Sequence, residues 1–302
     1  MADPKELAKK GDFITGGTFA CSGCQAVYGK RLVYHALGKN TIMINTAGCM
    51  TLTTTYPFTP YKAPWVHIAI QNAAAVGTGI SMGLKAQGKD KGVNIVAYAG
   101  DGASYDIGMQ ALSGAAHRNE NIIFICYNNS SFANTGFQRT SGSQLYAYTS
   151  TTPTGRKNKF GNILPRKNLA KIMAMHDIPY ATTACTSYPH DVIAKLRKAA
   201  SIKGFKFIDL LCSCQPGWGV EEQMMVEAGR MMVETGIWPM YEIENKRFKL
   251  SYKPKMLNVE EAFKLQKRFR HLDSRMIKKI QNIVNNEWKS INSGRFWDSH
   301  EY

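Results

Sequence analysis

Two short motifs in the chain combine glycine, carboxylate and amide groups. The first is Gly100-Asp101-Gly102, and 25 residues further on the chain reads Asn128-Asn129. Carboxylate and amide oxygens are ligands of hard cations such as Mg²⁺. Glycines let the backbone approach a phosphate closely, and the amino end of a following helix attracts the anion. A lone GDG is also compatible with an ordinary tight turn, but the paired motifs predict a site for a magnesium diphosphate.

Cysteines are the second set of residues that could do chemistry; they stand at positions 21, 24, 49, 126, 185, 212 and 214. Their odd number, without a secretory leader, argues against a disulfide framework. Cys21 and Cys24 form a Cys-x-x-Cys pair, and Cys49 with Cys212 or Cys214 would complete four thiolate ligands. The residues alone leave a zinc ion and an iron–sulfur cluster equally open. A thioredoxin-like pair is less well supported, because the fold context for it is missing.

The elements that must position these motifs alternate between strand and helix. Residues 93–99 and 121–127 are apolar runs typical of buried strands, and each stands just before one motif. A helix is expected between them, from about residue 106 to residue 117. Further strands are expected at 41–46 and 205–211, and further helices at 32–37, 72–84, 169–175 and 191–200. This order predicts an α/β fold, a mostly parallel sheet with helices on both faces, and both motifs at its carboxyl edge.

The character of the chain changes towards its end. We expect residues 1–226 to form the domain that carries both motifs and the cysteines, and residues 227–302 to form a C-terminal extension. Within the extension, residues 236–258 are rich in proline, tyrosine and lysine and show few strand signals. Two amphipathic helices are expected near 259–270 and 274–292. The extension is predicted to pack on the core or on a partner subunit.

The chain is strongly basic, with 38 Lys and Arg against 22 Asp and Glu among 302 residues, a net charge of +16. Such a charge is compatible with nucleic-acid binding, with an acidic partner or with an anionic substrate. The charges are spread along the chain without an Arg-rich run or zinc-finger spacing, so we expect no nucleic acid. No apolar stretch is long enough for a membrane span, and the N-terminus lacks the apolar core of a signal peptide. The expected location is the cytoplasm.

At the level of whole motifs, the chain resembles thiamine diphosphate enzymes, whose cofactor motif is GDG followed by NN. Within them it is most similar to the β subunit of the pyruvate:ferredoxin oxidoreductase (pyruvate synthase) family. The resemblance covers nearly the whole chain and rests on CSGC at 21–24, NTAGC at 45–49, GDGASYDIG at 100–108, YNNSSFANTG at 127–136, CQPGW at 214–218 and LQKRFRHL at 265–272. It implies a thiamine diphosphate-binding fold.

The resemblance also implies roles for individual residues. Magnesium would be held by Asp101, the side chain of Asn129 and the carbonyl of Ser131, and Asn134 would face the reacting end of the cofactor. Gly100, Gly102 and Cys49 would also line the thiamine site. A [4Fe–4S] cluster close to the thiamine would be held by Cys21, Cys24, Cys49 and Cys214. The sequence departs from the family at Gln25-Ala26, where Gly-Glu is common, and at Asn128, where Asp is frequent.

The function that the resemblance implies is oxidative decarboxylation of a 2-oxoacid, most simply pyruvate. The products would be acyl-CoA and CO₂, with electrons passing through the cluster to ferredoxin, and the reaction would be reversible. The Glu that activates thiamine and the 2-oxoacid pocket would lie on another subunit, so the expected partners are α and γ or δ subunits, ferredoxin, coenzyme A and the substrate. The alternatives are an enzyme for oxalate, 2-oxoglutarate or a branched 2-oxoacid, and a non-catalytic basic protein with structural zinc.

Overall fold

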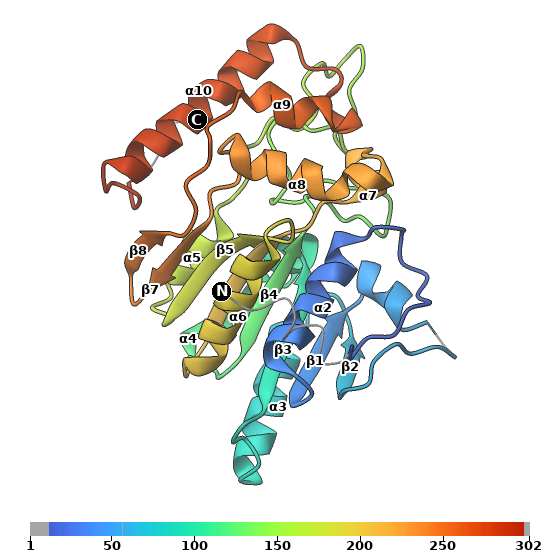
Figure 1. Ribbon diagram of the computed structural model, residues 1–302, viewed down its shortest axis with the longest axis vertical. Coiled ribbons are helices and arrows are strands. Elements are labelled where there is room, and N and C mark those ends of the chain that lie inside the picture. Colours follow the sequence, from blue (N-terminus) through green and yellow to red (C-terminus); the bar gives the residue numbers. More distant parts are fainter. Residues whose placement is uncertain (1–11, 56, 299–302) are drawn as a thin grey trace.

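One eight-stranded sheet runs through the molecule in the computed structural model, which describes residues 12–55 and 57–298 (Figure 1). The strand order is β2-β1-β3-β4-β6-β5-β7-β8, and the first six strands of this order are parallel. The strands are β1 (Thr41–Thr46), β2 (Trp65–Ile68), β3 (Asn94–Gly100), β4 (Ile123–Asn128), β5 (Tyr180–Cys185), β6 (Lys206–Leu211), β7 (Tyr241–Glu244) and β8 (Arg247–Leu250). The predicted fold class is confirmed.

The central strands are buried on both faces, which explains their apolar sequences. Every residue of β4 and β6 is buried, and so are the five inner residues of β3. A parallel strand with helices on both sides has no solvent face, so it reads as a continuous apolar run. This is why the sequence identified these three strands most clearly.

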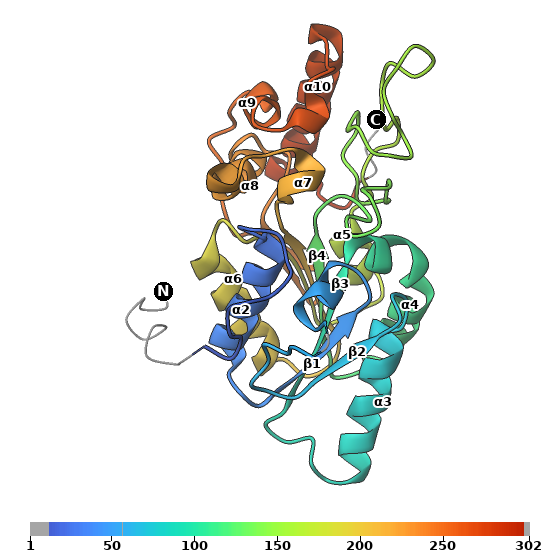
Figure 2. The same ribbon diagram turned by 90° about the vertical axis from the view of Figure 1, so that its right-hand side faces the viewer.

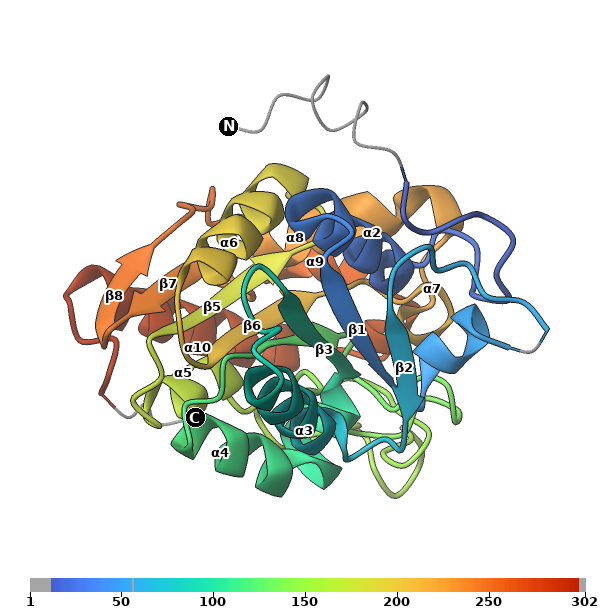
Figure 3. The same ribbon diagram turned by 90° about the horizontal axis from the view of Figure 1, so that it is seen from below.

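Helices cover both faces of the sheet (Figure 3). On one face, α2 (Gln25–Leu37) and α6 (Pro189–Ser201) pack against each other and against the inner strands. On the other face lie α3 (Ala73–Ala86), α4 (Met109–His117) and α5 (Leu169–Ala174). The two layers enclose separate apolar cores, one on each side of the sheet.

The last helices lie beyond the carboxyl edge of the parallel strands (Figures 1 and 2). They are α7 (Gln215–Trp218), α8 (Met225–Glu234), α9 (Val259–Lys264) and α10 (Ser274–Asn292). The α10 helix begins after Asp273, whose side chain accepts from the Met276 amide at 2.8 Å. Its buried side chains recur every three or four residues and form the apolar stripe of an amphipathic helix. No helix within the described ranges is long and apolar enough to cross a membrane.

Most expected elements are present, and the differences are concentrated in short strands. The strand at 41–46 and the helix at 274–292 have the predicted bounds. The sequence did not reveal β2 or β5, because β2 has only four residues and the Thr- and Ala-rich sequence of β5 gives a weak strand signal. Residues 236–258 contain β7 and β8, which extend the sheet from β5 as antiparallel strands.

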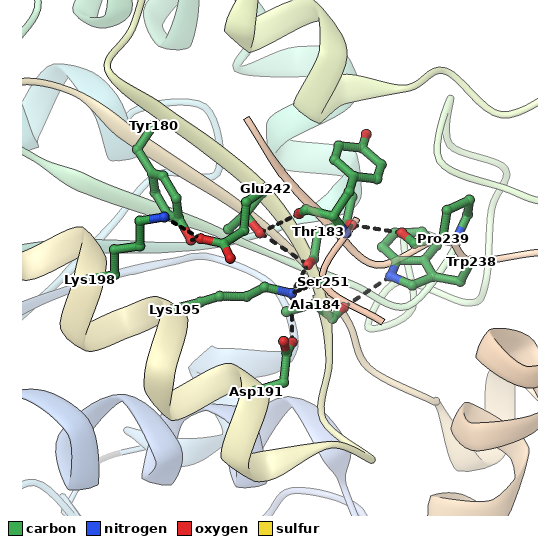
Figure 4. A network of polar contacts seen from close by, with 12 residues as sticks. Tyr180, Thr183, Ala184, Asp191, Lys195, Lys198, Trp238, Pro239, Glu242 and Ser251 are labelled. Atoms are coloured by element: carbon green, nitrogen blue, oxygen red, sulfur yellow. Dashed lines mark hydrogen bonds and ion pairs between the residues drawn. The ribbon is translucent and has the colours of Figure 1, made fainter. Parts of the chain in front are cut away.

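A polar network anchors this antiparallel hairpin to α6 (Figure 4). The Lys195 Nζ, which is almost fully buried, donates to Asp191 Oδ2 at 2.7 Å, to the Thr183 carbonyl at 2.8 Å and to Ser251 Oγ at 2.8 Å. Nearby, the half-exposed Lys198 pairs with Glu242 at 2.7 Å. All three N–H groups of Lys195 therefore have acceptors, on α6, on β5 and just after β8.

We predict that Lys195→Met lowers the free energy of unfolding by about 2 kcal/mol, because it leaves a carboxylate and two further acceptors unpaired. The loss stays below that of a fully buried pair, since 22% of the Asp191 side chain is exposed. Lys198→Met should cost at most about 1 kcal/mol, as is usual for exposed pairs. Urea unfolding of both variants checks this, and equal losses would contradict it.

Candidate functional site

The candidate site lies at the carboxyl edge of the sheet, where the strand order reverses. β2 and β3 lie on opposite sides of β1, so the loops that follow β1 and β3 diverge and leave a crevice between them. A narrow cavity of about 40 Å³ occupies this point. Its walls come from the chain that follows β1, β2, β3 and β4, including Gly48, Cys49, Ile70, Asp101, Gly102, Asn129, Ser131 and Asn134. The two predicted motifs are thus brought together.

The helical segment after β3 begins earlier than the sequence suggested. A wide helical turn spans Gly102–Ile107, with the Gly108 amide donating to the Ala103 carbonyl five residues earlier at 2.9 Å. The expected start near Asp106 was therefore wrong, and the first helical residue directly follows Asp101. A Cβ atom at Gly102 would overlap the ring of Phe132. Only glycine lets the turn pass this close to the loop that follows β4.

Three oxygen-bearing groups crowd together beside the cavity. One terminal atom of the Asn129 amide lies 2.8 Å from the Ser131 carbonyl oxygen and 3.1 Å from Asp101 Oδ1. With the NH₂ group turned towards them, the amide donates to both; turned the other way, it places its oxygen among two other oxygens. Neighbouring ligands of octahedral Mg²⁺, with bonds of 2.0–2.1 Å, lie about 2.9 Å apart. The two distances from the Asn129 amide therefore match the spacing of neighbouring magnesium ligands.

The Asp101 carboxylate is held in place and almost fully buried. The Thr140 hydroxyl donates to Asp101 Oδ2, and the backbone N–H of Asn129 donates to Asp101 Oδ1 at 3.4 Å. Burial raises the pKa of Asp101 to about 7, against the opposing effect of these hydrogen bonds. A carboxylate in such an environment gains most from a nearby cation, which favours its ionised form.

Four of the seven cysteines line a second cavity of about 210 Å³. Cys21 and Cys24 form a turn in which the Cys24 amide donates to the Cys21 carbonyl at 3.1 Å, directly before α2. Cys49 stands in the turn after β1, and Cys214 precedes α7. In the described part of the chain, no three Cys, His, Asp or Glu side chains are arranged to hold a single metal ion. The thiols instead surround a space large enough for a multi-atom group.

The other three cysteines lie elsewhere. Cys126, Cys185 and Cys212 are fully buried among apolar side chains. Cys212 is the residue after β6 and belongs to the core beneath α2, whereas Cys214, two residues on, reaches the cavity. The sequence left these two open as the fourth thiol, and it is Cys214 that the structure brings beside Cys21, Cys24 and Cys49.

Comparisons with known proteins agree with this geometry. Residues 46–210 match the family model described as the thiamine pyrophosphate enzyme, C-terminal TPP binding domain. Pyruvate synthase subunit PorB of Methanothermobacter thermautotrophicus is 47% identical over 90% of this chain and 95% of the relative, and that of Methanocaldococcus jannaschii is 45% identical over 93% and 96%. The ketoisovalerate oxidoreductase subunit VorB of Pyrococcus furiosus is 38% identical over 92% of both chains.

The chain belongs to the pyruvate synthase β-subunit family of 2-oxoacid:ferredoxin oxidoreductases. A solved structure of 2-oxoglutarate:ferredoxin oxidoreductase from Magnetococcus marinus shares the fold, with a TM-score of 0.60 and 18% identity over 89% of this chain and 94% of that one. The resemblance inferred from the motifs is confirmed, and so is the oxidoreductase class.

The departure from the family at Asn128 has a structural reason. The Asn128 amide donates to Asp209 Oδ1 at 3.2 Å and to the Tyr105 hydroxyl at 3.1 Å, and its oxygen accepts from the Ser130 amide at 3.1 Å. Tyr105 also donates to Asp209. An aspartate at 128 would place a second carboxylate against the buried Asp209, whereas the amide donates a hydrogen bond to it. Asn128 therefore supports the loop rather than reaching the cavity.

Arg268 lies within the family-like LQKRFRHL segment, but no pattern in the sequence distinguishes it from the other basic residues there. Its guanidinium is buried, lies 4.2 Å from the Trp218 ring centroid and donates from Nε to Gln266 Oε1 at 2.9 Å. Burial lowers the pKa of Arg268 to about 9, and Cys214 and Asp101 act in the opposite direction. The group is therefore cationic near neutral pH, and its charge interacts with those of Cys214 and Asp101. Only the folded arrangement reveals this, because residue 268 is far from both motifs in sequence.

The two cavities adjoin each other through a common wall. Cys49, Asn129, Ala133 and Asn134 line both of them. Asn134 is exposed, so it is accessible at the boundary. The Trp218 indole N–H donates to the Asn129 carbonyl at 2.8 Å and ties the segment after Cys214 to the loop after β4. A group in one cavity would lie close to a group in the other.

We predict that Asp101→Ala weakens binding of thiamine diphosphate with Mg²⁺ by more than about 100-fold. It removes the only carboxylate of the three-oxygen group, whereas losses outside the ligand shell alone cost about 10–100-fold. Binding of a metal group by the four cysteines should be unaffected. Calorimetric titration of the cofactor checks this.

Asp106→Asn is the matched control, since Asp106 stands on the same helical turn but accepts from the Ser141 amide at 3.0 Å. An asparagine oxygen can still accept there, so cofactor binding should persist. Full cofactor affinity in Asp101→Ala would show that the assignment is wrong.

Proposed function

We propose that this chain is the thiamine diphosphate-binding β subunit of a pyruvate:ferredoxin oxidoreductase. The enzyme would convert pyruvate and coenzyme A to acetyl-CoA and CO₂, releasing a proton and passing two electrons to ferredoxin. The observation that carries the proposal is the common wall between the Asp101–Asn129 cavity and the cavity lined by four cysteines. Oxidative decarboxylation with one-electron acceptors requires such adjacency of an organic cofactor and a redox centre.

Asp101, the Asn129 side-chain oxygen and the Ser131 carbonyl would hold Mg²⁺, which in turn would hold the diphosphate. The spacing of the Asn129 amide from the other two groups supports this, as does the burial of Asp101. Gly100 and Gly102 would allow the close backbone approach. When bound, thiamine diphosphate supplies the electron sink that makes loss of CO₂ possible.

Cys21, Cys24, Cys49 and Cys214 would hold a [4Fe–4S] cluster. The chemistry of the donor set and the size of the cavity support a cluster. Burial raises the pKa of Cys49 and of Cys214 to about 12, so these thiols hold their protons until a metal displaces them. Arg268, whose charge interacts with that of Cys214, would offset part of the negative charge that the thiolates bring.

Asn134 would face the reacting end of the cofactor, because it is exposed at the boundary of the two cavities. The remaining parts of the reaction would come from partner subunits. The described residues supply no carboxylate to this cavity besides Asp101, which is assigned to the metal. A Glu for cofactor activation, and the groups that bind the 2-oxoacid carboxylate, would therefore lie on an α-type subunit, and γ or δ subunits would carry electrons onward to ferredoxin.

A branched 2-oxoacid is the second candidate substrate. It is favoured by the ketoisovalerate oxidoreductases among the relatives, although the pyruvate synthase subunits are more similar. Comparing turnover of pyruvate and 2-oxoisovalerate by the assembled enzyme would separate the two. Oxalate and 2-oxoglutarate belong in the same assay.

We predict that replacing any one of Cys21, Cys24, Cys49 or Cys214 with Ser lowers the iron content of anaerobically purified protein by at least half. Each replacement removes one thiolate from a four-ligand set. Cys126→Ser, Cys185→Ser and Cys212→Ser are the matched controls, because these thiols lie outside the cavity. Iron analysis with a visible spectrum provides the measurement. Loss of iron from Cys212→Ser but not from Cys214→Ser would overturn the assignment of the fourth ligand.

A further prediction concerns the partner subunits. Alone, the chain should bind thiamine diphosphate weakly and show no pyruvate-dependent reduction of a dye. Adding the partner subunits should restore the dye reduction. The charge of +16 should attract an acidic ferredoxin and speed its association with the enzyme. Reduction of ferredoxin should therefore slow as the salt concentration rises above about 0.15 M, where the Debye length is about 8 Å. Sustained turnover by the isolated chain would refute the subunit model. A salt-independent rate would remove the steering role.

A further inference from the structure

Lys30 is a buried lysine that the proposed reaction does not use. It lies on α2, six residues after Cys24, and its side chain is fully buried. The ammonium donates to Asn45 Oδ1 at 2.9 Å and to the Tyr61 hydroxyl, and it lies 5.1 Å from the Tyr61 ring centroid and 5.2 Å from that of Tyr98. All these partners are neutral. Among the described residues, no carboxylate comes within ion-pair distance of it.

Lys195 shows how the same fold stabilises a buried lysine for purely structural reasons. Its Nζ has three acceptors, and one of them is the carboxylate of Asp191 at 2.7 Å. Lys30 has two acceptors and no carboxylate. A buried ammonium without a counter-ion is costly, so the environment of Lys30 is incomplete in this chain as it stands.

The position of Lys30 indicates which group completes it. Burial lowers the pKa of Lys30, and Cys24 is the group that acts in the opposite direction. A hydrogen-bond chain also leads from Lys30 through the Tyr61 hydroxyl to Thr53, which donates to the Met50 carbonyl at 2.7 Å in the turn that begins at Cys49. Lys30 thus connects the two segments that present Cys24 and Cys49 to the cavity.

We propose that the Lys30 ammonium is the counter-charge to the iron–sulfur cluster and raises its reduction potential. This inference rests on the cluster assigned to the four cysteines. Four thiolates give a [4Fe–4S] cluster a net negative charge, which increases when an electron enters. A buried cation nearby stabilises the reduced form more than the oxidised form, because charge interactions are only weakly screened in the protein interior. Lys30 therefore acts through the cluster as a potential-setting residue and does not touch the substrate.

The test compares the cluster midpoint potential in Lys30→Met with that in the parent chain, by spectroscopic redox titration of reconstituted protein. We expect reduction to become at least about tenfold less favourable, which corresponds to about 59 mV for a one-electron couple. Tyr61→Phe, which breaks the hydrogen-bond chain but keeps the ammonium, should shift the potential much less. Equal potentials in Lys30→Met and the parent would overturn the proposal.

Lys206→Met is the matched control. Lys206 is also buried, and its Nζ donates to Asn121 Oδ1 at 2.7 Å without a carboxylate, but it begins β6 at the opposite edge of the sheet from the cysteines. Its replacement should leave the potential unchanged. A shift of the same size in Lys206→Met would show that the effect is not specific to the cysteine cavity, and would overturn the proposal.

A second measurement decides the case in which Lys30→Met retains little iron. In cluster-free protein, urea unfolding should find Lys30→Met at least as stable as the parent, since it removes an uncompensated buried charge. Destabilisation of the cluster-free protein would mean that Lys30 is structural and would overturn the proposal. If the parent chain itself binds no iron, the cluster assignment fails first and the role of Lys30 falls with it. A normal iron content with an unchanged potential overturns the Lys30 proposal alone.

Discussion

The close packing of a carboxylate, a side-chain amide and a backbone carbonyl sets the requirements of the site. A terminal atom of the buried Asn129 side chain lies 3.1 Å from Asp101 Oδ1 and 2.8 Å from the Ser131 carbonyl oxygen. An amide NH₂ can separate them when no metal is present, but a divalent cation satisfies all three at once. The tight turn at Gly102, the amide at Asn128 and the hydroxyl of Thr140 all serve to hold these oxygens in place.

The topology of the sheet explains why this arrangement has a second cavity beside it. Because the strand order reverses at β1 and β3, the turn after β1 is directed to the same crevice as the GDG turn. Cys49 stands in that turn, and the common wall of the cavities follows from this placement. α2 and α7 then bring the other thiols to the edge, each at the start of a helix. The GDG turn and the four thiols therefore lie at one edge of one sheet.

The sequence predicted the parts of this design that depend on local patterns. Apolar runs identified β3, β4 and β6, and the GDG and NN motifs stand at the carboxyl ends of β3 and β4. It could not choose between Cys212 and Cys214, because residues two apart on an extended segment share a face, and only the path of the chain after β6 separates them. Arg268 and Lys30 were missed because a charged residue on a helix normally indicates solvent exposure. Arg268 is also far in sequence from both motifs.

The most direct test of the account is the proximity of the metal–diphosphate site and the cysteine cavity. Mn²⁺ can replace Mg²⁺ with thiamine diphosphate, and its electron paramagnetic resonance can be recorded with the [4Fe–4S] cluster oxidised and then reduced. We predict stoichiometric Mn²⁺ binding and a signal that broadens when the cluster becomes paramagnetic. An unchanged Mn²⁺ signal in protein fully loaded at both sites would contradict the common wall on which the proposed function rests.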